Sequence, residues 1–521
     1  MGKAPGKMPP MDVKFVARTT ALALLVVIAP MIPVGLWSAT LDAPPEWDAA
    51  KAFGATVLVS IFTLGTAIAF LRPKTSHFGR REAFLMVALA WTIAPIVAGL
   101  PFLFWARWLG HQPLPAHPFQ SPLNCYFEAM SGLTTTGASI LPDIESLPRG
   151  LLLWRSTTHW LGGLGIILLF VAILPMVGVT GRKLHLVEST GLKSSGTHPR
   201  IRDTARGLWF TYAALTLGSI VALRLAGLPW FESLCETFGA IATGGFSVRN
   251  QSIAAYHSAW VDAIIVLVMI LGAINFSLYL ELARSRYRLV RRDPELRLLL
   301  ILLTAGSLVV VLAVFGTRIE TMTARLLPAQ IGPAIRYGVF NLVSMHTDTG
   351  FATADFDQWP FLALAAIVLG TFIGGSAGST TGGIKVVRLI VAAKILLREL
   401  QLFIRPDMVK PIRLGHRVID ADEQMSVIIT ILCFVLALFT GTVLLMLIGP
   451  APQAMDLRTA FSASLACLCT AGPGLGDVGP THNYLFLPDP GKIVLCLLML
   501  IGRLEIIPIL ALIHPRFWRQ H

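Results

Sequence analysis

The sequence predicts an all-α integral membrane protein, in which an N-terminal pair of helices precedes four similar helical repeats. Three observations predict this fold: an apolar composition, a series of apolar windows as long as a bilayer is thick, and a Gly/Thr-rich run that returns four times. Of 521 residues, 55% are hydrophobic and 14% are charged, with a mean hydropathy of +0.69. Soluble domains carry about 25% charged residues, so the composition disfavours a soluble helical protein.

Ten apolar windows are long enough to cross a bilayer as helices. The first is too long, and is followed by too many others, to be only a cleaved signal peptide. The windows lie near 14–37, 53–71, 83–106, 151–177, 207–226, 259–283, 298–316, 359–393, 425–449 and 492–513.

The net charge of +13 follows the expected topology and does not indicate a nucleic-acid partner. Lys and Arg cluster in alternate connections between the windows, whereas the connection at 38–51 is net acidic. This positive-inside pattern predicts that both termini are cytoplasmic. Anionic lipid headgroups and a cytoplasmic protein are secondary partners for the basic connections. These basic connections are 1–18, 71–82, 178–206, 284–297, 385–417 and the end after 514.

Beyond residue 80 the chain repeats a plan of span, short outer segment, Gly/Thr-rich run and second span. The runs are TTTGA at 134–138, ATGGF at 242–246, TDTGF at 347–351 and TAGPG at 470–474. Gly137, Gly245, Gly350 and Gly472 are taken as equivalent positions. The predicted units are an N-terminal hairpin at 1–80 and repeats at 81–181, 182–290, 291–415 (with a broken second helix) and 416–521.

Each run follows an apolar stretch of about a dozen residues, which is too short to cross a bilayer. We therefore expect re-entrant half-helices followed by extended backbone, which is tolerated at membrane depth only where protein or a water-filled cavity surrounds it. Glycine permits unusual φ angles, and carbonyl groups can replace the water shell of a cation. The alternative is that each run is an interhelical turn or a close-packing contact.

The segment at 374–383, GGSAGSTTGG, interrupts a long apolar window. Each glycine costs about 1 kcal/mol in a helix relative to alanine, so we expect the helix to break there and the polar segment to face a pore. A glycine-rich helix-packing face is the alternative. The residues concerned are Gly374, Gly375, Ser376, Ala377, Gly378, Ser379, Thr380, Thr381, Gly382 and Gly383.

Several charged residues lie at unusual places. Arg503 lies about ten residues inside the last window, where a charge usually faces a cavity or a partner, with snorkelling to the interface as the alternative. Asp348 stands between two threonines of the third run, where it either raises cation affinity or alters selectivity, or else faces outward and is capped by backbone amides. Glu128, Glu232 and Glu236 either attract cations or bond to nearby amides.

Several stretches resemble the Trk/Ktr/HKT superfamily of potassium transporters. They are FEAMSGLTTTGAS, ATGGFS, TDTGFATADF and AGPGLG, together with 154–175, IGGSAGSTTGGIKVVR at 373–388 and 502–518. The resemblance covers the chain from about residue 80 to its end. The extra N-terminal hairpin is similar to the bacterial Trk branch.

The resemblance implies a pseudo-fourfold pore for K⁺ in a bacterial cytoplasmic membrane, with Na⁺ or H⁺ as a possible coupled ion. It also implies a homodimer with one pore per subunit and a cytoplasmic nucleotide-binding ring protein as partner. In the related plant transporters, serine at the first glycine accompanies sodium preference, so Gly137 favours potassium. The 374–383 segment and Arg503 are implied as gate, and the filter residues are Thr135, Thr136, Gly137, Thr243, Gly244, Gly245, Thr347, Asp348, Thr349, Gly350, Thr470, Ala471 and Gly472.

No enzyme motif is present: there is no Walker A sequence, no HExxH and no GxSxG between a strand and a helix. An alternating-access transporter of another ion or a small anion is the competing function. It predicts paired helix breaks in inverted repeats with basic binding residues. The four runs instead have the same sense, with a single break in the middle of a span.

Overall fold

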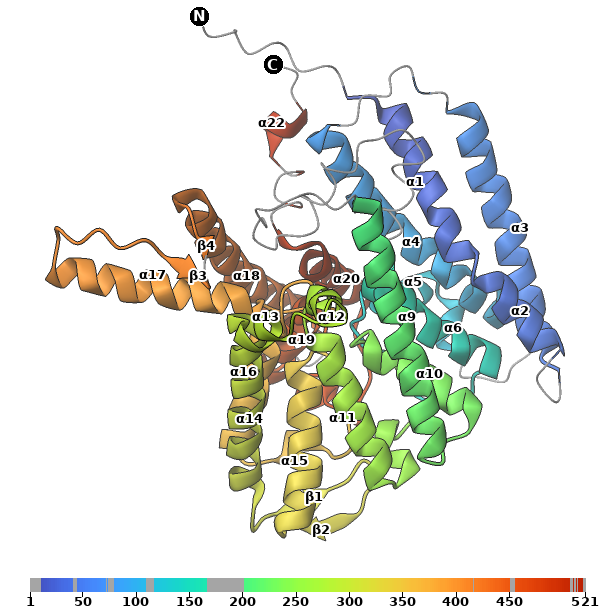
Figure 1. Cartoon of the computed structure of the whole chain (residues 1–521). Helices are drawn as coiled ribbons and strands as arrows, with labels where there is room; N and C mark the ends of the chain where they lie inside the picture. The colour runs from blue at the N-terminus through green and yellow to red at the C-terminus, as the bar shows by residue number, and fades with distance from the viewer. Residues whose placement is uncertain are drawn as a thin grey trace, which may run out of the picture.

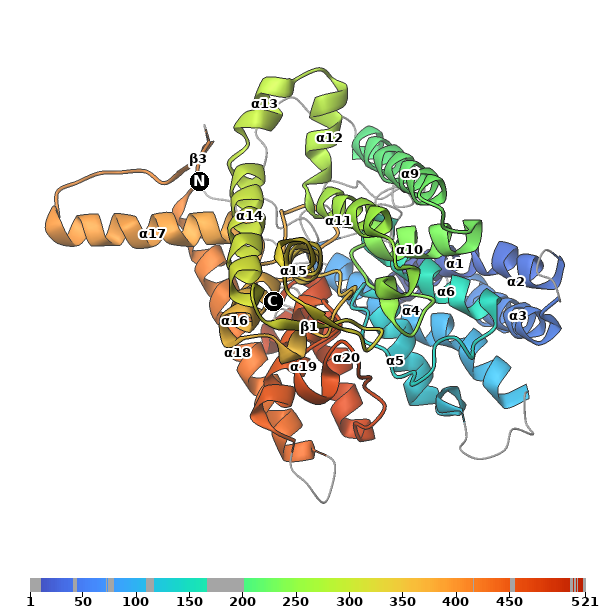
Figure 2. The ribbon, with the colours of Figure 1, turned by 90° about the horizontal axis from the view of Figure 1, so that it is seen from below.

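Helices account for most of the computed structural model, and those far apart in sequence surround a common centre (Figures 1 and 2). Figure 2 shows the molecule from below, and there the four repeats follow one another around the central axis in chain order. The described residues are 11–40, 45–71, 73, 79–108, 117–165, 201–415, 417–449, 455–506, 509, 512 and 514–518. The boundary at 182 and most of the basic connection 178–206 lie outside them.

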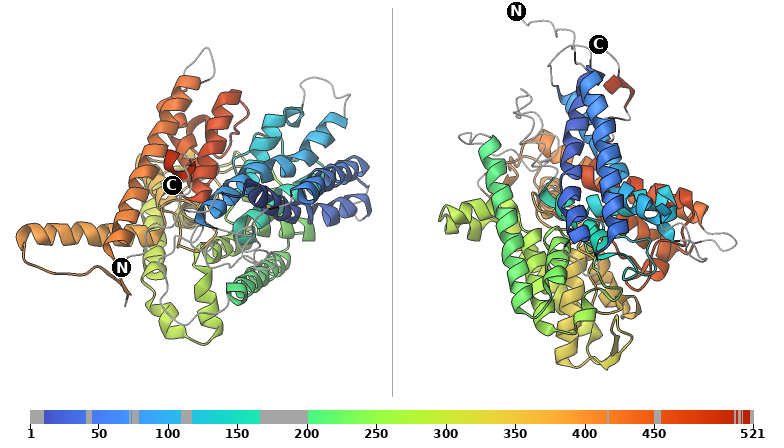
Figure 3. Two further views of the ribbon diagram at one scale, coloured as in Figure 1. Left: turned by 90° about the horizontal axis from the view of Figure 1, so that it is seen from above. Right: turned by 90° about the vertical axis from the view of Figure 1, so that its right-hand side faces the viewer.

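The N-terminal helices form a layer against the first repeat. They are α1 (Val13–Ile28), α2 (Met31–Thr40) and α3 (Trp47–Phe70), and α1 and α3 pack on α4 (Arg80–Trp108). Phe62 and Phe70 of α3 are exposed, as is expected of side chains that face lipid. The right-hand view of Figure 3 shows this layer in front of the rest.

Each repeat has a short helix between two others. The first helices are α4, α9 (Ile201–Leu225), α14 (Pro294–Val314) and α18 (Ala421–Ile448); the second helices begin with α6 (Arg149–Trp160), α11 (Ala259–Ala273), α16 (Phe361–Ile373) and α20 (Asp489–Leu504). The short helices, which we call the inner helices, are α5 (Pro122–Leu133), α10 (Trp230–Ile241), α15 (Ile331–His346) and α19 (Leu457–Cys469). They have 12, 12, 16 and 13 residues, and at 1.5 Å per residue none spans a hydrocarbon core of about 30 Å.

Six helices of the described chain are long and apolar enough to cross a membrane, and a seventh span is formed by α11 and α12 (Phe276–Ala283) if that bent pair is counted as one. Ten spans were predicted. The window 151–177 continues beyond the described residues, and 359–393 is divided into α16 and α17 (Val386–Ile404). The expectation that only one span breaks is wrong, because α11 and α12 meet at 92°.

The last predicted window, 492–513, is interrupted at Glu505. Helix α20 ends at Leu504, Glu505 has a φ of 57°, and the described residues Ile506, Ile509 and Leu512 are again helical. At this break the Glu505 carboxylate forms an ion pair with Arg388 of α17.

After the 374–383 segment, α17 leaves the bundle as a lateral arm, visible in Figure 1 and from above in Figure 3. Two short hairpins depart from the all-α pattern: β1 (Arg318–Glu320) pairs with β2 (Leu326–Pro328), and β3 (Arg413–Leu414) pairs with β4 (Arg417–Val418). The remaining elements are α13 (Tyr287–Arg292), α22 (Pro515–Trp518), η1 (Pro118–Gln120), η2 (Leu161–Gly165), η5 (Ser252–Tyr256), η6 (Phe356–Gln358) and η7 (Gly476–Val478).

Candidate functional site

The four Gly/Thr-rich runs, which we call the four loops, have the same backbone conformation. In each, a residue with positive φ follows the inner helix, and the predicted glycine follows two residues later, also with positive φ. The first positions are Thr135, Thr243, Asp348 and Thr470 at 57°, 51°, 54° and 58°; the glycines Gly137, Gly245, Gly350 and Gly472, here called the ring glycines, have 80°, 80°, 83° and 85°.

The inner helices hold the loops in the same way four times. The amide of the residue between the two positive-φ positions donates to a carbonyl of its own inner helix, five residues back, at 2.8 Å in every repeat. The donors are Thr136, Gly244, Thr349 and Ala471, and the acceptors are Ser131, Gly239, Ser344 and Ala466.

A polar side chain of each inner helix also accepts from the amide three residues beyond the ring glycine. The pairs are Glu128 with Ile140 (3.0 Å), Glu236 with Val248 (3.2 Å), Asn341 with Thr353 (3.3 Å) and Ser462 with Leu475 (2.9 Å). Glu128 and Glu236 therefore bond to amides, which was one of the two alternatives left open. Glu232 instead lies near the partly exposed Arg249.

The ring glycines close a ring in chain order. A Cβ atom on Gly137 would lie 2.1 Å from the carbonyl oxygen of Gly244, and one on Gly245 would lie 2.0 Å from that of Thr349. The third and fourth contacts are Gly350 to Ala471 at 2.1 Å and Gly472 to Thr136 at 2.6 Å. Each glycine therefore touches the next loop, and no side chain fits at any of the four positions.

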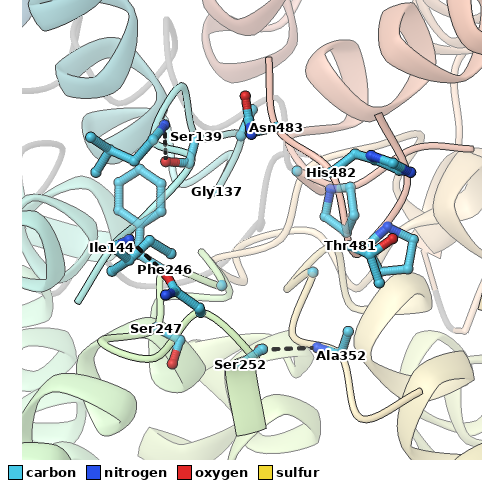
Figure 4. Close-up of a pocket in the computed structure, with 18 of the residues that line it drawn as sticks. Gly137, Ser139, Ile144, Phe246, Ser247, Ser252, Ala352, Thr481, His482 and Asn483 are labelled. Atoms are coloured by element: carbon cyan, nitrogen blue, oxygen red, sulfur yellow. Dashed lines mark hydrogen bonds between the residues drawn. The ribbon is translucent and has the colours of Figure 1, made fainter. Parts of the chain in front are cut away.

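A cavity of about 210 Å³ opens on one side of this ring. All four ring glycines line it, and Figure 4 shows residues from all four repeats around it, among them Ser139, Phe246, Ala352 and His482. Ser252 accepts from the Ala352 amide at 3.2 Å and so joins the second repeat to the third.

The 374–383 segment covers the opposite side of the ring, against the first positive-φ positions. Thr243 donates its hydroxyl hydrogen to Thr380 Oγ1 at 3.1 Å. A Cβ atom on Gly382 would lie 2.3 Å from Thr470 Oγ1, and one on Gly374 would lie 2.9 Å from Asp348 Oδ2. The predicted gate residues and three of the four loops are thus brought together.

The backbone groups left free by one helix break form hydrogen bonds with those of the other. The sharp turn after α11 leaves the last carbonyl groups of that helix without helical partners. The amides of Ser376 and Thr380 donate to Ala273 and Gly272 at 3.0 and 3.2 Å. Glu295 of α14 accepts from the Ala377 amide at 2.6 Å. Polar backbone in both breaks is therefore paired within the protein.

Arg503 joins the remaining loop to this segment. Its guanidinium donates to Thr135 Oγ1 at 3.2 Å and to the Thr380 carbonyl at 3.0 Å, and it also bonds to the carbonyl groups of Gly162 and Gly163. The structure thus places Arg503 beside the 374–383 segment, and these interior contacts leave no geometry for snorkelling to the interface.

Asp348 does not face outward, as the capping alternative supposed. It occupies the position of Thr135, Thr243 and Thr470, is fully buried, and its carboxylate lies against Gly374. The Gly382 amide approaches this carboxylate and the Lys385 ammonium acts on it electrostatically.

One important residue was missed in the sequence. Arg155 of α6 is fully buried and bonds to Glu128 at 2.8 Å and to the Ser247 carbonyl at 3.2 Å, so it connects the first two repeats. The argument that identified Arg503, a charge inside an apolar window, also applies to Arg155. The sequence gives no comparable reason to select Asn341 and Ser462, because short polar residues are common in such helices.

These features define a multi-pass membrane protein with four short-helix loops meeting at one ring. A profile of the TrkH family, described as cation transport protein, matches residues 56–519. The chain belongs to this family, whose members transport ions and are not enzymes, as the sequence predicts.

The chain is similar to two Trk system potassium uptake proteins TrkH along nearly their whole lengths. The identity is 35% with that of Halomonas elongata, covering 98% of this chain and 100% of the relative. It is 34% with that of Escherichia coli K12, covering 91% and 93%. The crystal structure of the potassium transporter TrkH from Vibrio parahaemolyticus superimposes with a TM-score of 0.81 at 31% identity, covering 97% of this chain and all of that one. This match confirms the predicted all-α membrane fold.

The buried Arg155–Glu128 pair gives a stability prediction. Arg155→Met should lower the free energy of unfolding by about 3–5 kcal/mol, because it leaves a buried carboxylate without its cation. Lys51→Met is the control, since that side chain is 65% exposed in its pair with Asp48 and exposed pairs contribute about 1 kcal/mol at most. Unfolding by denaturing detergent in mixed micelles measures both. Equal losses in the two variants would contradict the role given to Arg155.

Proposed function

We propose that this protein takes up potassium ions across the cytoplasmic membrane of a bacterium, through a pore whose selective region is the ring of four loops. The observation that carries the proposal is the cyclic contact of the ring glycines with the carbonyl groups of Gly244, Thr349, Ala471 and Thr136. Four carbonyl-bearing loops around one point offer a dehydrated cation a substitute for its water shell. The names of the relatives support potassium as the ion.

The orientation of the inner helices also favours a cation. Each ends immediately before its loop, so the negative ends of four helix dipoles lie beside the ring. This arrangement favours a cation and opposes the competing function, an alternating-access carrier that holds an anion at helix N-termini. Both helix breaks also occur in the second helix of their repeats. These repeats run in the same direction and are not inverted. Flux of potassium, rubidium and sodium into vesicles, with and without a pH or sodium gradient, tests the function and any coupled ion.

The 374–383 segment and Arg503 are proposed as the gate. Together they touch the first positive-φ residue of every loop: Arg503 touches Thr135, and the segment lies against Thr243, Asp348 and Thr470. A plug in this position limits flux without setting selectivity, because it offers no closed ring of carbonyl groups. The segment leads directly into α17, so a force on that arm reaches the plug.

We also propose the assembly that the resemblance implies and the orientation that the positive-inside pattern predicts. Leu396, Leu397, Leu400, Phe403 and Ile404 are exposed along the α17 arm, which supports contact with a second copy in a homodimer. The basic connection at 284–297, with the exposed arginines of α13, offers a surface for a cytoplasmic nucleotide-binding ring protein. The beginning of α1 and helix α22 lie at the same end of the molecule in Figure 1, which supports two cytoplasmic termini.

Gly137→Ser should reduce the ratio of potassium to sodium flux. The residue has a φ of 80°, and a Cβ atom would lie 2.1 Å from the Gly244 carbonyl oxygen, so two adjacent loops must shift. Loss of one contact between a charge and a dipole is worth about 1.5–3 kcal/mol, which is more than tenfold in the ratio. Gly218→Ser is the control, because a Cβ atom there has nothing within 4 Å. An unchanged ratio in Gly137→Ser would count against the ring as filter.

Deletion of residues 376–381 should increase potassium flux severalfold and leave the potassium-to-sodium ratio nearly unchanged. The deletion removes the Thr243–Thr380 and Arg503–Thr380 contacts under the ring but leaves the ring glycines. Flux into vesicles at matched protein amounts measures it, with and without the nucleotide-binding partner, on which dependence should weaken. Lower flux from correctly inserted protein would refute the plug, and a lost ion preference would assign the segment to the filter.

A further inference from the structure

One ring glycine differs from the other three in what its carbonyl group contacts. The hydroxyl of Tyr484, in the segment between η7 and α20, donates to the Gly472 carbonyl at 2.7 Å. Tyr484 is buried, with 2% of its surface exposed. Among the described residues, the carbonyl groups of Gly137, Gly245 and Gly350 accept no hydrogen bond. Among the ring-glycine carbonyls of the described chain, that of Gly472 is therefore the one held by a side chain.

The first repeat holds Tyr484 in place. Its amide donates to the Ser139 carbonyl at 2.9 Å, and its ring lies 5.8 Å from that of Phe127 in α5. Ser139 is two residues beyond Gly137 in the first loop. Tyr484 thus bridges the fourth loop and the first, which is the junction that closes the ring.

This junction is also the loosest of the four. The separation from the added Cβ atom to the next carbonyl oxygen is 2.6 Å at Gly472 and 2.0–2.1 Å at the other three glycines. The fourth repeat departs from the others elsewhere too, because Ser462 lies ten residues before its ring glycine whereas Glu128, Glu236 and Asn341 lie nine before theirs. Tyr484 therefore bridges the two loops whose direct contact is the least close of the four.

We propose that Tyr484 is a positioning residue for ion selectivity, which fixes the orientation of the Gly472 carbonyl and the width of the ring between the fourth and first loops. The proposal rests on the proposed role of the ring as filter. A smaller ion such as sodium is well coordinated only if the carbonyl groups move inward. A carbonyl held from the side by a buried donor resists that movement, and the penalty falls on sodium more than on potassium.

Tyr484→Phe tests this directly, because it keeps the ring packed on Phe127 and removes only the hydroxyl, which donates to Gly472 and also contacts the Cys467 thiol. The ratio of potassium to sodium flux should fall about fivefold, which is the factor that one neutral hydrogen bond is worth. The matched control is Tyr279→Phe in α12, whose hydroxyl donates to the Leu271 carbonyl at the same 2.7 Å. The control loses an equivalent bond away from the ring, so its ratio should stay at the wild-type value.

The outcomes separate this inference from the function on which it rests. An unchanged ratio in Tyr484→Phe, with a changed ratio in Gly137→Ser, overturns the role of Tyr484 and leaves the filter intact. Unchanged ratios in both variants overturn the filter itself, and an equal fall in Tyr279→Phe shows a general loss of stability and overturns the specific role. If Tyr484→Phe does not fold, 3,5-difluorotyrosine at position 484 replaces it, since that side chain keeps the shape and is a stronger donor. Its ratio should rise, and no change overturns the proposal.

Discussion

Four close approaches of a glycine to a carbonyl group of the neighbouring loop determine how the rest of the molecule is arranged. They bring extended backbone from four distant parts of the chain to one point, at a depth where water is scarce. Every amide and carbonyl group there must be paired within the protein or directed at an ion. The inner helices meet that requirement with a 2.8 Å bond from the middle of each loop and with one polar side chain that accepts from the returning strand.

The same requirement explains the region on the other side of the ring. The turn after α11 exposes two carbonyl groups, and the 374–383 segment supplies the amides that bond to them. Arg503 and Glu295 complete the pairing from α20 and α14. A helix break that would be costly alone is therefore stabilised by a second break.

Local composition predicted the features that depend on local chemistry. Glycine at Gly137 and Gly245, the shortness of α5 and α10, and the polar interruption at 374–383 all follow from residue type and window length. The missed features depend on partners far away in sequence. The bend after α11 has neither glycine nor proline at Ile274 and Asn275, and the carbonyl groups it frees are paired by a segment a hundred residues later.

Two further features could not be predicted from the sequence, because they depend on charged groups that are distant along the chain. The break after α20 lies where Glu505 pairs with Arg388, a contact that no window of the sequence contains. Asp348 was noticed as unusual, but its direction follows from the positive φ that it shares with Thr135, Thr243 and Thr470, which places its side chain toward the 374–383 segment. Tyr484 was not predicted, because nothing in the sequence of an outer connection indicates that its hydroxyl contacts the ring.

The central claim is that the four loops form one cation site. Crystals of the protein grown or soaked in thallium or rubidium salts test it most directly, because both ions substitute for potassium and scatter anomalously. The account predicts an anomalous peak on the axis of the ring, within coordination distance of loops from all four repeats, which is lost when sodium replaces the heavier ion. Full occupancy of a site elsewhere, with no peak among the four ring glycines, would contradict it.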